Sequence, residues 1–516
     1  MSHIYLVRLG GNILQVVTAN EMYEIDRFTM GEIGLPGVLL MENAGQAFVQ
    51  KALNYLNQSQ KIAVLIGTGN NGGDGFVIAR ILKSLEFRAD AYLIVEEGKV
   101  KGDALFHFNA FRSSGYEVMP LCDLNGLQHY DVIVDAMLGI GIKGEIKSPY
   151  REIIEACNEV NNFKISVDIQ SGVRADGSQP FNLAFKANVT ITLQHPKLSA
   201  FTFPAREYYG ELEVVPIGIP PKATQAVVKL DRKCWTEKEV QQTLTNRSPS
   251  SHKGIHGKGL VIGGSLPMTG APVMTTRAVL RAGGGLTTLA IPDAIHSIVA
   301  SQIVEAMFSP WKSVNGHFSG ELGTDVSRFD AVAFGPGVGR ENGGEKILST
   351  LLDNVKAPLI VDADGLFYLA KLKEKLKQRS HPTIITPHTG EFAQLTGYLP
   401  TEIENNRFEL SRQFALRYGV YIVLKGPYSI VTTPTGSQFV NTSGNAALAK
   451  GGTGDVLTGI ILAFVMNHSN LQEAVSNAVF AHGKAADVLV EGNHTMRDVI
   501  ATDVINALPT VFRTFH

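Results

Sequence analysis

Short apolar runs alternate with segments of helical periodicity through the first half of the chain. The segment FVIARILKSL (76–85) places its apolar residues at helical spacing. Buried strands are predicted at KIAVLIG (61–67), AYLIVEE (91–97), DVIVDAM (131–137) and KISVDIQ (164–170), with a further candidate in ITLQHPKLSAF (191–201). Strands that alternate with helices in this way predict a parallel sheet with right-handed crossovers.

The alternation stops between residues 216 and 258, where the chain is rich in proline, glycine and polar residues, and then begins again. Strands are predicted at 259–265, 286–292, 330–337, 358–365, 382–388 and 421–427, and GGTGDVLTGIILAFV (451–465) reads as a glycine loop that opens a helix. The halves share no alignable repeat. We therefore expect two α/β domains, residues 1–225 and 226–516.

The composition is that of a globular protein. Of 516 residues 44% are apolar and 18% are charged, and the net charge of −2 gives no basic excess for binding nucleic acid. The cysteines Cys122, Cys157 and Cys234 lie far apart without a CxxC pair, which argues against a disulfide framework or zinc site and favours a reducing cytoplasm. Polar residues interrupt the apolar N-terminal stretch, and no run of about 18 apolar residues occurs, so we expect neither a signal peptide nor a membrane span.

The loop GTGNNGGDG (67–75) follows the first predicted strand and has the G-x-G-x-x-G spacing of dinucleotide-binding loops. Its glycines suit a phosphate cradle, but the charge of Asp74 opposes phosphate. A carboxylate with neighbouring amides suits a hard cation, which can lie beside the phosphates and offset the repulsion. The plainer alternative is a tight turn in which Asp74 caps a helix. Asp135 and Asp168 end two further strands, and parallel strands bring both to one edge of the sheet.

These segments resemble the NAD(P)H-hydrate epimerase family over most of residues 18–220. The resemblance is carried by GTGNNGGDGFVIAR, DRFTMGEIGLPGVLLMENAG (26–45), VDAMLGIGIKGE (134–145) and VDIQSG (167–172). It implies a Rossmann-like fold and inversion of the C6 centre of hydrated NADH or NADPH. The usual family motif is DIPSG, so Gln170 stands in place of a proline. That difference removes a rigid turn but no ligand atom.

The same resemblance implies roles for single residues. The dinucleotide is expected to contact Asn70, Asn71, Gly72, Gly73, Asp74, Gly139, Ile140, Gly141, Ile142, Lys143, Gly144 and Glu145. A potassium ion is expected at Asn71, Asp135 and Ser171, and Asp168 is expected to bind the reacting part of the substrate. In the hydrate the C6 hydroxyl lies beside the ring nitrogen, so an acid can help it leave, and one carboxyl group, Asp168, can serve first as acid and then as base.

The second glycine loop, GGTGDVLTG (451–459), places backbone amides at a helix N-terminus with Asp455 in the first turn. Such a terminus stabilises anions, and an adjacent carboxylate can act on a hydroxyl that attacks a phosphoryl group. The alternative is an ordinary helix start with Asp455 as a cap. His388 and Lys425 follow predicted strands, and their plainer readings are a structural histidine and a solvated surface lysine.

This helix start is similar to that of ribokinase-like proteins. With HKGIHGKG (252–259), GGSLPMTGAP (263–272), GPGVG (335–339), DADG (362–365), TPHTGEF (386–392) and KGPYSIV (425–431), it resembles the ADP- or ATP-dependent NAD(P)H-hydrate dehydratase family over about residues 236–510. The resemblance implies substrate contacts at Ala271, Gly337, His388 and Asp455, nucleotide contacts at Lys425, Gly426, Pro427, Tyr428, Ser429 and Gly454, and catalysis by Asp455. The family usually has PHPGE, where this chain has Thr389.

Together the two resemblances imply a bifunctional NAD(P)H-hydrate repair enzyme, in which one half supplies the epimer that the other half accepts. The expected substrates are the hydrates NADHX and NADPHX. The expected cofactors are a potassium ion in the first half and magnesium with ADP in the second, with AMP and phosphate as products. A homo-oligomer in the cytoplasm is expected, with no nucleic-acid or membrane partner.

Two other classes of function compete with this interpretation. A ribokinase-like small-molecule kinase with an N-terminal nucleotide-sensing domain would phosphorylate a stable alcohol with ATP, since a fold does not fix a function. A non-catalytic dinucleotide-binding adaptor would bind tightly without turnover. An NAD-dependent dehydrogenase is less favoured, because nothing in the second half resembles a hydride-transfer site.

Overall fold

The computed structural model describes residues 7–8, 14–121, 123–177 and 182–515. The chain divides into two compact units, Met1–Asp231 and Arg232–His516. The division falls after helix α6 (Pro221–Val227), whereas the sequence alone placed it near residue 225. Helix α6 belongs to the first unit because its Ala223 is buried in the core of that unit.

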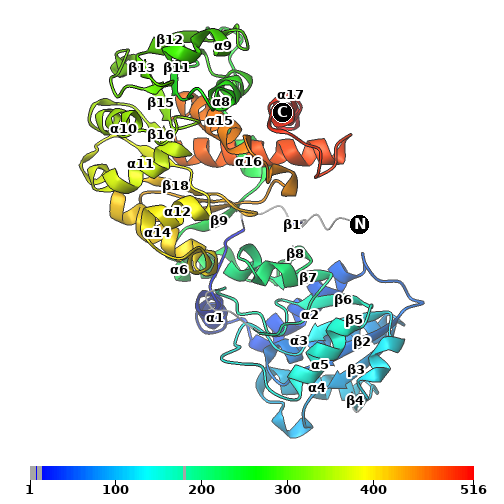
Figure 1. The fold of residues 1–516 in the computed structure, drawn as a ribbon. Helices are drawn as coiled ribbons and strands as arrows, with labels where there is room; N and C mark the ends of the chain where they lie inside the picture. The colour runs from blue at the N-terminus through cyan, green and yellow to red at the C-terminus, as the bar shows by residue number, and fades with distance from the viewer. Residues whose placement is uncertain (1–6, 9–13, 122, 178–181, 516) are drawn as a thin grey trace. The chain divides into compact units, whose positions relative to one another are not determined.

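The first unit contains an eight-stranded parallel sheet (Figure 1). In order across the sheet its strands are β1 (Val7–Arg8), β8 (Glu211–Val215), β7 (Val189–Leu193), β6 (Phe163–Val167), β5 (Val132–Ala136), β2 (Lys61–Ile66), β3 (Arg88–Leu93) and β4 (Val118–Pro120). The chain runs outward from β2 to β4 and then returns to β5 on the other side of β2. Ligands of open parallel sheets bind beside such a reversal, at the carboxyl ends of the strands.

Helices cover both faces of this sheet. They are α1 (Ala19–Phe28), α2 (Gly37–Ala52), α3 (Asn70–Ser84), α4 (Gly102–Ser113), α5 (Tyr150–Glu159) and α6, with shorter helical turns η1 (Thr29–Ile33), η2 (Glu97–Lys99), η3 (Asn125–His129), η4 (Leu198–Phe201) and η5 (Ala205–Tyr208). Ile62 and Val64 of β2 pack in one core with α2, α3 and α4, while Ala63 and Leu65 pack in the other with α5. Burial on both faces explains the unbroken apolar run at 61–66.

The structure corrects three boundaries predicted for the first unit. Helix α3 begins at Asn70, so most of the predicted loop 67–75 is helical. Its glycines allow close packing, because a Cβ on Gly72 would lie 1.9 Å from the carbonyl oxygen of Gly67. Strand β3 spans 88–93 rather than 91–97, and β7 ends at Leu193, so that most of the candidate strand 191–201 lies outside it.

The second unit contains a ten-stranded sheet. Its order is β12 (Met307–Trp311), β11 (Leu286–Pro292), β10 (Lys258–Ile262), β15 (Ala331–Phe334), β16 (Leu359–Val361), β17 (Thr383–Ile385), β18 (Tyr421–Leu424), β19 (Ile430–Thr432), β20 (Gln438–Asn441) and β9 (Arg232–Trp235), and β13 (Ser313–Val314) pairs separately with β14 (His317–Phe318). The strands from β12 to β18 are parallel, and β19 is antiparallel to both of its neighbours.

Two groups of helices sandwich the second sheet. One face carries α7 (Glu237–Thr243), α8 (Gly270–Arg281), α9 (His296–Ala300), α15 (Thr453–Asn467), α16 (Leu471–Glu491) and α17 (Ala501–Thr514), and the other carries α10 (Asn342–Asn354), α11 (Asp364–Leu372), α12 (Thr389–Thr396), α13 (Pro400–Asn405) and α14 (Arg407–Tyr418). Short helical turns are η6 (Asp293–Ile295), η7 (Val326–Arg328), η8 (Lys373–Gln378) and η9 (Ala446–Leu448). The predicted class of two α/β domains is confirmed.

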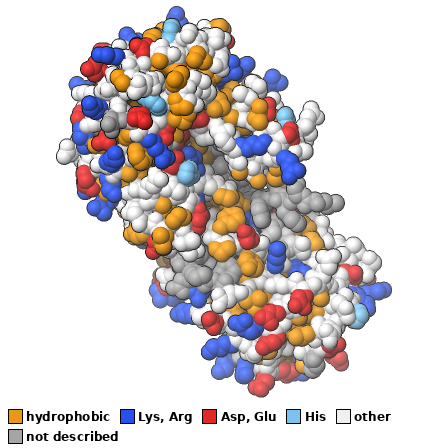
Figure 2. Space-filling model, viewed as in Figure 1, with side chains coloured by type: hydrophobic (Ala, Val, Ile, Leu, Met, Phe, Trp, Pro, Cys, Tyr) orange, Lys and Arg blue, Asp and Glu red, His pale blue; other side chains and the backbone are white. Residues whose placement is uncertain are grey.

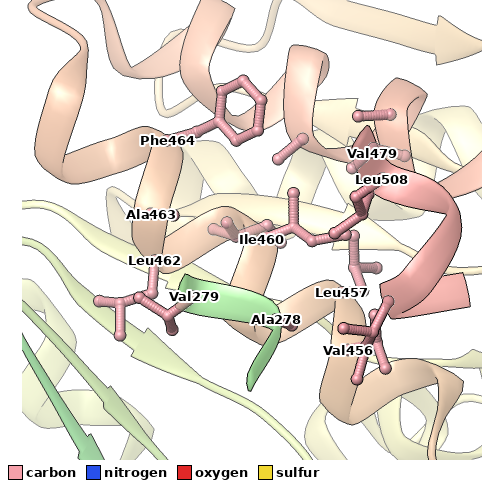
Figure 3. Close-up of a cluster of buried hydrophobic side chains, with 14 of the residues drawn as sticks. Ala278, Val279, Val456, Leu457, Ile460, Leu462, Ala463, Phe464, Val479 and Leu508 are labelled. Carbon is pink, nitrogen blue, oxygen red and sulfur yellow. The ribbon is translucent and has the colours of Figure 1, made fainter. Parts of the chain in front are cut away.

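Helix α15 lies at the centre of one core of the second unit. It is apolar on nearly all sides, and Figure 3 shows its Val456, Leu457 and Ile460 among side chains of neighbouring helices. It packs so closely on α8 that a Cβ on Gly459 would lie 2.2 Å from the carbonyl oxygen of Thr275. A helix buried in this way is held rigidly, and so is its N-terminus, where the second glycine loop lies.

The visible surface agrees with the balanced composition. Lys and Arg side chains are interspersed with Asp and Glu on the face that Figure 2 shows. Among the helices of the described residues, none combines the length and apolar character that a membrane span requires.

Candidate active sites

A cavity of about 490 Å³ lies at the carboxyl edge of the first sheet, beside the reversal of strand order between β2 and β5. Helices α1 and α3 and the segments that follow β6 and β7 provide its ionisable groups. These include Tyr23, Asp26, Asp74, Asp168 and Lys197, and Asp103 and Tyr150 also line the cavity. A cavity with ionisable groups at this edge is where an α/β sheet of this kind binds a nucleotide.

The cavity brings together part of the predicted dinucleotide site. The predicted residues that line it are Asn70, Asn71, Asp74, Gly139, Ile140, Gly141 and Ile142. Those that do not line it are Gly72, Gly73, Lys143, Gly144 and Glu145. Gly73 instead allows helix packing, because a Cβ there would lie 2.3 Å from the sulfur of Met41. Lys143 and Glu145 are exposed.

Asp74 does not cap a helix, so that alternative is wrong. It is the fifth residue of α3, whose N-cap is Gly69, and it is buried beside the cavity. Burial, followed by repulsion from Asp168 and Asp26, raises the pKa of Asp74 well above its ordinary value. The shift is toward protonation, and protonation would remove the repulsion of a phosphate.

Asp135, Ser171 and Asn71 meet around one turn after β5. The backbone N–H and the hydroxyl of Ser171 donate to the Asp135 carboxylate at 2.8 and 2.5 Å, and the Asn71 amide donates to the Leu138 carbonyl at 3.1 Å. Burial raises the pKa of Asp135 to about 6 in spite of these hydrogen bonds. Within the described residues Asp135 has no ion-pair partner.

Asp168 is held in place through one of its own carboxylate oxygens, Oδ1. Its φ is +64°, which non-glycine residues rarely adopt. Its Oδ1 accepts hydrogen bonds from Thr192 Oγ1 at 3.1 Å and from the Leu193 N–H at 2.9 Å, and it forms an ion pair with Lys197, whose side chain is 1% exposed. Among the described residues no hydrogen bond to Oδ2 is found, so this oxygen is available to a ligand in the cavity.

Gln170, which stands where the family motif has a proline, is buried. Its side-chain amide donates to the hydroxyl of Thr190, which in turn donates to the carbonyl of Tyr209 at 2.7 Å. Gln170 therefore fixes the turn through side-chain hydrogen bonds where a proline would fix it through its ring.

The second set of predicted residues gathers at the carboxyl ends of β15 to β18 and at the start of α15. Gly337 follows β15 with a φ of +66°, and a Cβ there would lie 3.0 Å from that of Ala271 on α8. A Cβ on Gly454 would lie 3.4 Å from the Nζ of Lys425 after β18. Gly337 and Ala271 are therefore neighbours, as are Gly454 and Lys425, although the members of each pair come from separate segments of the sequence.

Lys425 is not a solvated surface lysine. Its Nζ lies 3.0 Å from Oδ1 of Asp362, which follows β16 and is buried, and the Thr458 hydroxyl donates to the other oxygen of Asp362 at 2.6 Å. Burial opposes both charges, but their attraction outweighs it: the pKa of Asp362 lies below its ordinary value and that of Lys425 above. An ion pair with one buried partner, Asp362, therefore lies beside the start of α15.

His388 has a structural role in the free protein. It is the N-cap of α12, where its Nδ1 accepts the N–H of Gly390 at 3.0 Å. Its Nε2 lies 3.4 Å from Glu391, whose carboxylate also lies 3.7 Å from Lys425. The imidazole is 60% exposed and so remains accessible to a ligand. Thr389, the departure from the family motif, donates to Glu404.

The turn 425–429 joins β18 to β19. The guanidinium of Arg407 donates to the Lys425 carbonyl at 3.1 Å, and a Cβ on Gly426 would lie 2.6 Å from it. Tyr428 is buried, and the Ser429 hydroxyl donates to the Gly426 carbonyl at 3.4 Å. Only glycine fits against this guanidinium.

Asp455 is the third residue of α15, in its first turn as predicted. The N-cap is Gly452, and within the described residues the Asp455 carboxyl makes no hydrogen bond, so it is not a cap. Burial, followed by repulsion from Asp362, raises the pKa of Asp455 to about 7, because Lys425 is already paired and offsets only part of this effect. The group is therefore available to a ligand and titrates near neutral pH.

Comparison with known proteins identifies both halves. A family model described as NAD(P)H-hydrate dehydratase matches residues 259–510, and one described as YjeF-related protein N-terminus matches residues 38–199. The bifunctional NAD(P)H-hydrate repair enzyme of Thermofilum pendens is 34% identical over 98% of this chain and 97% of its own length. The Escherichia coli enzyme of the same name is 31% identical over 96% of this chain and 93% of its own length. This chain belongs to the bifunctional NAD(P)H-hydrate repair enzymes.

A solved structure is similar to the dehydratase half. It is the ADP/ATP-dependent NAD(P)H-hydrate dehydratase of Bacillus subtilis co-crystallised with ATP/Mg2+, which is 31% identical, with a TM-score of 0.48, and which covers 56% of this chain and 100% of its own.

The sequence did not single out five side chains that the repair enzyme places at these sites. They are Asp26, Lys197, Asp362, Glu391 and Thr458. Asp362 follows a predicted strand as Asp135 does, so the same rule would have found it. Asp26 lies on a helix before the first predicted strand, where no strand-end rule applies.

The raised pKa of Asp455 predicts how pH affects stability. The carboxyl titrates near 3.8 when unfolded and at about 7 when folded, so its ionisation destabilises the fold increasingly as pH rises from about 4 to about 7. Asp455→Asn removes this penalty. We expect the variant to have a higher Tm than the wild type at pH 8 and an equal Tm near pH 4, measured by thermal unfolding without nucleotide. A difference that is constant with pH would contradict the assignment.

Proposed function

We propose that the first unit epimerises C6 of the R and S hydrates of NADH and NADPH, and that the second dehydrates the S epimer at the expense of ADP, giving AMP and phosphate. The observation that carries the second assignment is the Asp455 carboxyl, which lies without a hydrogen-bond partner among the described residues at the N-terminus of α15, beside a paired lysine. Membership of the repair family supplies the substrate.

In the dehydratase site the C6 hydroxyl must become a better leaving group. Asp455 in its ionised form accepts the hydroxyl proton while the oxygen attacks the β-phosphorus of ADP, and AMP leaves. The ring nitrogen lone pair then expels phosphate from C6, and loss of the C5 proton restores the dihydronicotinamide. Lys425 and the backbone N–H groups at the start of α15 are positioned to stabilise phosphate charge.

The donor atoms at this site fit a magnesium ion carried by ADP. The Asp364 carboxylate lies near enough to raise the pKa of Asp455. When bound, Mg2+ would offset the negative charge of the phosphates, and Asp364 would help to hold it, which leaves Asp455 free to act as the base.

In the epimerase site Asp168 is the proposed acid–base group. Its free Oδ2 is available to the cavity, and its positive φ is the kind of strain that surrounding structure maintains at functional positions. Protonation of the C6 hydroxyl lets it leave as water, the ring nitrogen forms an iminium ion, and water returns from the other face.

A potassium ion fits the turn after β5. Asn71, Asp135 and Ser171 present oxygen donors, which a hard cation prefers, and the buried Asp135 carboxylate lacks a counter-charge among the described residues. A cation held there would supply that charge and fix the turn that carries Gly139. We also propose a cytoplasmic location, with which the free buried thiols of Cys157 and Cys234 agree, and assembly as a homo-oligomer.

Choice of nucleotide tests the overall assignment. Purified protein mixed with both hydrate epimers is expected to restore dihydronicotinamide absorbance faster with ADP than with ATP, releasing AMP and phosphate. Equal or faster turnover with ATP would contradict the ADP assignment alone. Phosphorylation of a stable alcohol without recovery of absorbance would instead favour a small-molecule kinase.

Asp455→Asn tests whether the two sites are independent. The amide keeps the shape of the side chain but cannot accept a proton, so dehydration is expected to fall by about 10²–10⁴-fold. Epimerisation, followed by chromatography without nucleotide, is expected to continue, because Asp168 lies in the other unit. Near-normal dehydration by Asp455→Asn would remove Asp455 from the catalytic role.

Asp135→Ala tests the cation site. The variant is expected to lose most epimerisation and its dependence on potassium, while it retains dehydration of the correct epimer. The wild type is expected to lose epimerisation in buffer without monovalent cations and to regain it on addition of KCl. Unchanged epimerisation without potassium, or an equal loss of both activities in the variant, would refute the assignment.

A further inference from the structure

Helix α1 presents two ionisable side chains to the epimerase cavity. Its Met22 and Ile25 are buried in the core, while Tyr23 and Asp26, three residues apart and therefore on one face, line the cavity. The Tyr23 hydroxyl reaches the loop after β5, since a Cβ on Gly141 would lie 2.5 Å from it. Helix α1 thus forms one wall of the cavity, whereas Asp168 belongs to the segment that follows β6.

The position of this wall is fixed relative to Lys197. The Val17 N–H donates to the Pro196 carbonyl at 3.0 Å, and the Leu198 N–H donates to the Val17 carbonyl at 3.2 Å. Thr18, the next residue, begins α1 with a capping box. The start of α1 and the segment that carries Lys197 are therefore joined by backbone hydrogen bonds on either side of that lysine.

Asp26 and Asp168 have opposite environments in the same cavity. Asp168 accepts hydrogen bonds and is paired with Lys197, whereas Asp26 has no hydrogen bond or ion pair among the described residues. Burial raises the pKa of Asp26 to about 6, with attraction by Lys197 opposing this effect and repulsion by Asp168 adding to it. Two carboxyl groups whose environments differ in this way suit opposite roles in acid–base chemistry.

We propose that epimerisation uses two carboxyl groups, with Asp26 as the acid that protonates the departing C6 hydroxyl and Asp168 as the base on the other face. This inference rests on the proposed epimerase function and replaces its single acid–base group with two. Lys197 is a positioning residue, because it holds Asp168 through Oδ1 and leaves Oδ2 to face the substrate.

The reaction balances as follows. Asp26 gives its proton to the hydroxyl, the C6–O bond breaks, water leaves, and the ring nitrogen lone pair forms the iminium bond. A second water adds to the opposite face of C6, the π electrons return to nitrogen, and the proton of this water passes to Asp168. Exchange with solvent returns the proton to Asp26. The reverse reaction begins from the form in which Asp168 carries the proton, so either direction requires one proton shared between two carboxyl groups.

Four ionisable groups face Asp26. Tyr23 lies on the same helix, Asp74 on α3, and Asp168 and Lys197 follow β6 and β7. The pKa of Tyr23 is raised above its ordinary value of 10.0 and that of Asp74 well above its own. Tyr23 therefore stays protonated where Asp26 titrates and supplies no pH limb near 6. A limb that belongs to Asp26 rather than to Asp74 must disappear in the variant Asp26→Asn.

The test is the pH profile of epimerisation by the full-length protein, with the uncatalysed rate subtracted and both epimers measured by chromatography without nucleotide. Wild-type kcat/KM is expected to fall about tenfold per pH unit above about pH 6, because Asp26 loses its proton there. Asp26→Asn is expected to be about 10²–10⁴-fold slower below pH 6 and to show no fall above it. Asp26→Glu is expected to restore part of the rate together with the limb.

Asp103→Asn is the matched control, because Asp103 also lines the cavity and undergoes the same change of group. It should retain the limb near pH 6. Thermal unfolding checks that Asp26→Asn is folded. A rate for Asp26→Asn within about threefold of wild type, or a slow variant that keeps the limb, would overturn the inference and favour a single carboxyl group. Full activity of Asp168→Asn, or a wild type without epimerisation, would instead defeat the proposed function itself.

Discussion

Both candidate sites are built around an ion pair between a lysine and an aspartate at the carboxyl edge of a sheet, in which one partner is buried and the other is partly exposed. In the first unit Lys197 pairs with Asp168, and in the second Lys425 pairs with Asp362. Removing both charges from water is costly, and loss of one partner would leave an unpaired buried charge. Such pairs are therefore poor devices for stability. In each pair the lysine holds its aspartate in position. Because the lysine is already paired, it offsets only part of the cost of ionising the other carboxyl groups nearby.

This second effect explains the unusual carboxyl groups beside each pair. Asp26 and Asp74 lie near Lys197, and Asp455 and Glu391 lie near Lys425, but each lysine already has a closer partner. Burial then disfavours ionisation, repulsion by the paired aspartate adds to it, and the pKa of each neighbour rises. Each site thus contains one carboxylate paired with a lysine and other carboxyl groups whose pKa is raised, which is a division that suits acid–base catalysis.

The sequence predicted the fold class and the edge of each sheet at which the candidate site residues gather, because strand ends are local patterns and parallel strands bring them together. It could not predict that NNGGDG would be helical, since the glycines that suggest a loop are required by the packing of α3 on β2 and β5. The sequence also did not predict which aspartate each lysine pairs with. It indicated Lys425 as a site residue but not Lys197. Pairing across 29 or 63 positions depends on tertiary contacts that no local pattern contains.

Both proposed reactions use a carboxyl group with a raised pKa. This group donates a proton in the epimerase site and accepts one in the dehydratase site. In both, the ring nitrogen expels a group from C6. In the proposed epimerase mechanism that group is water, made by a proton from Asp26, whose pKa burial raises to about 6, and since water returns, the step only equilibrates the epimers. In the proposed dehydratase mechanism the group is phosphate, made at the expense of ADP, and Asp455, whose pKa is raised to about 7, accepts a proton. Consumption of ADP makes the second step directional, and it draws the equilibrium of the first toward the epimer that it consumes.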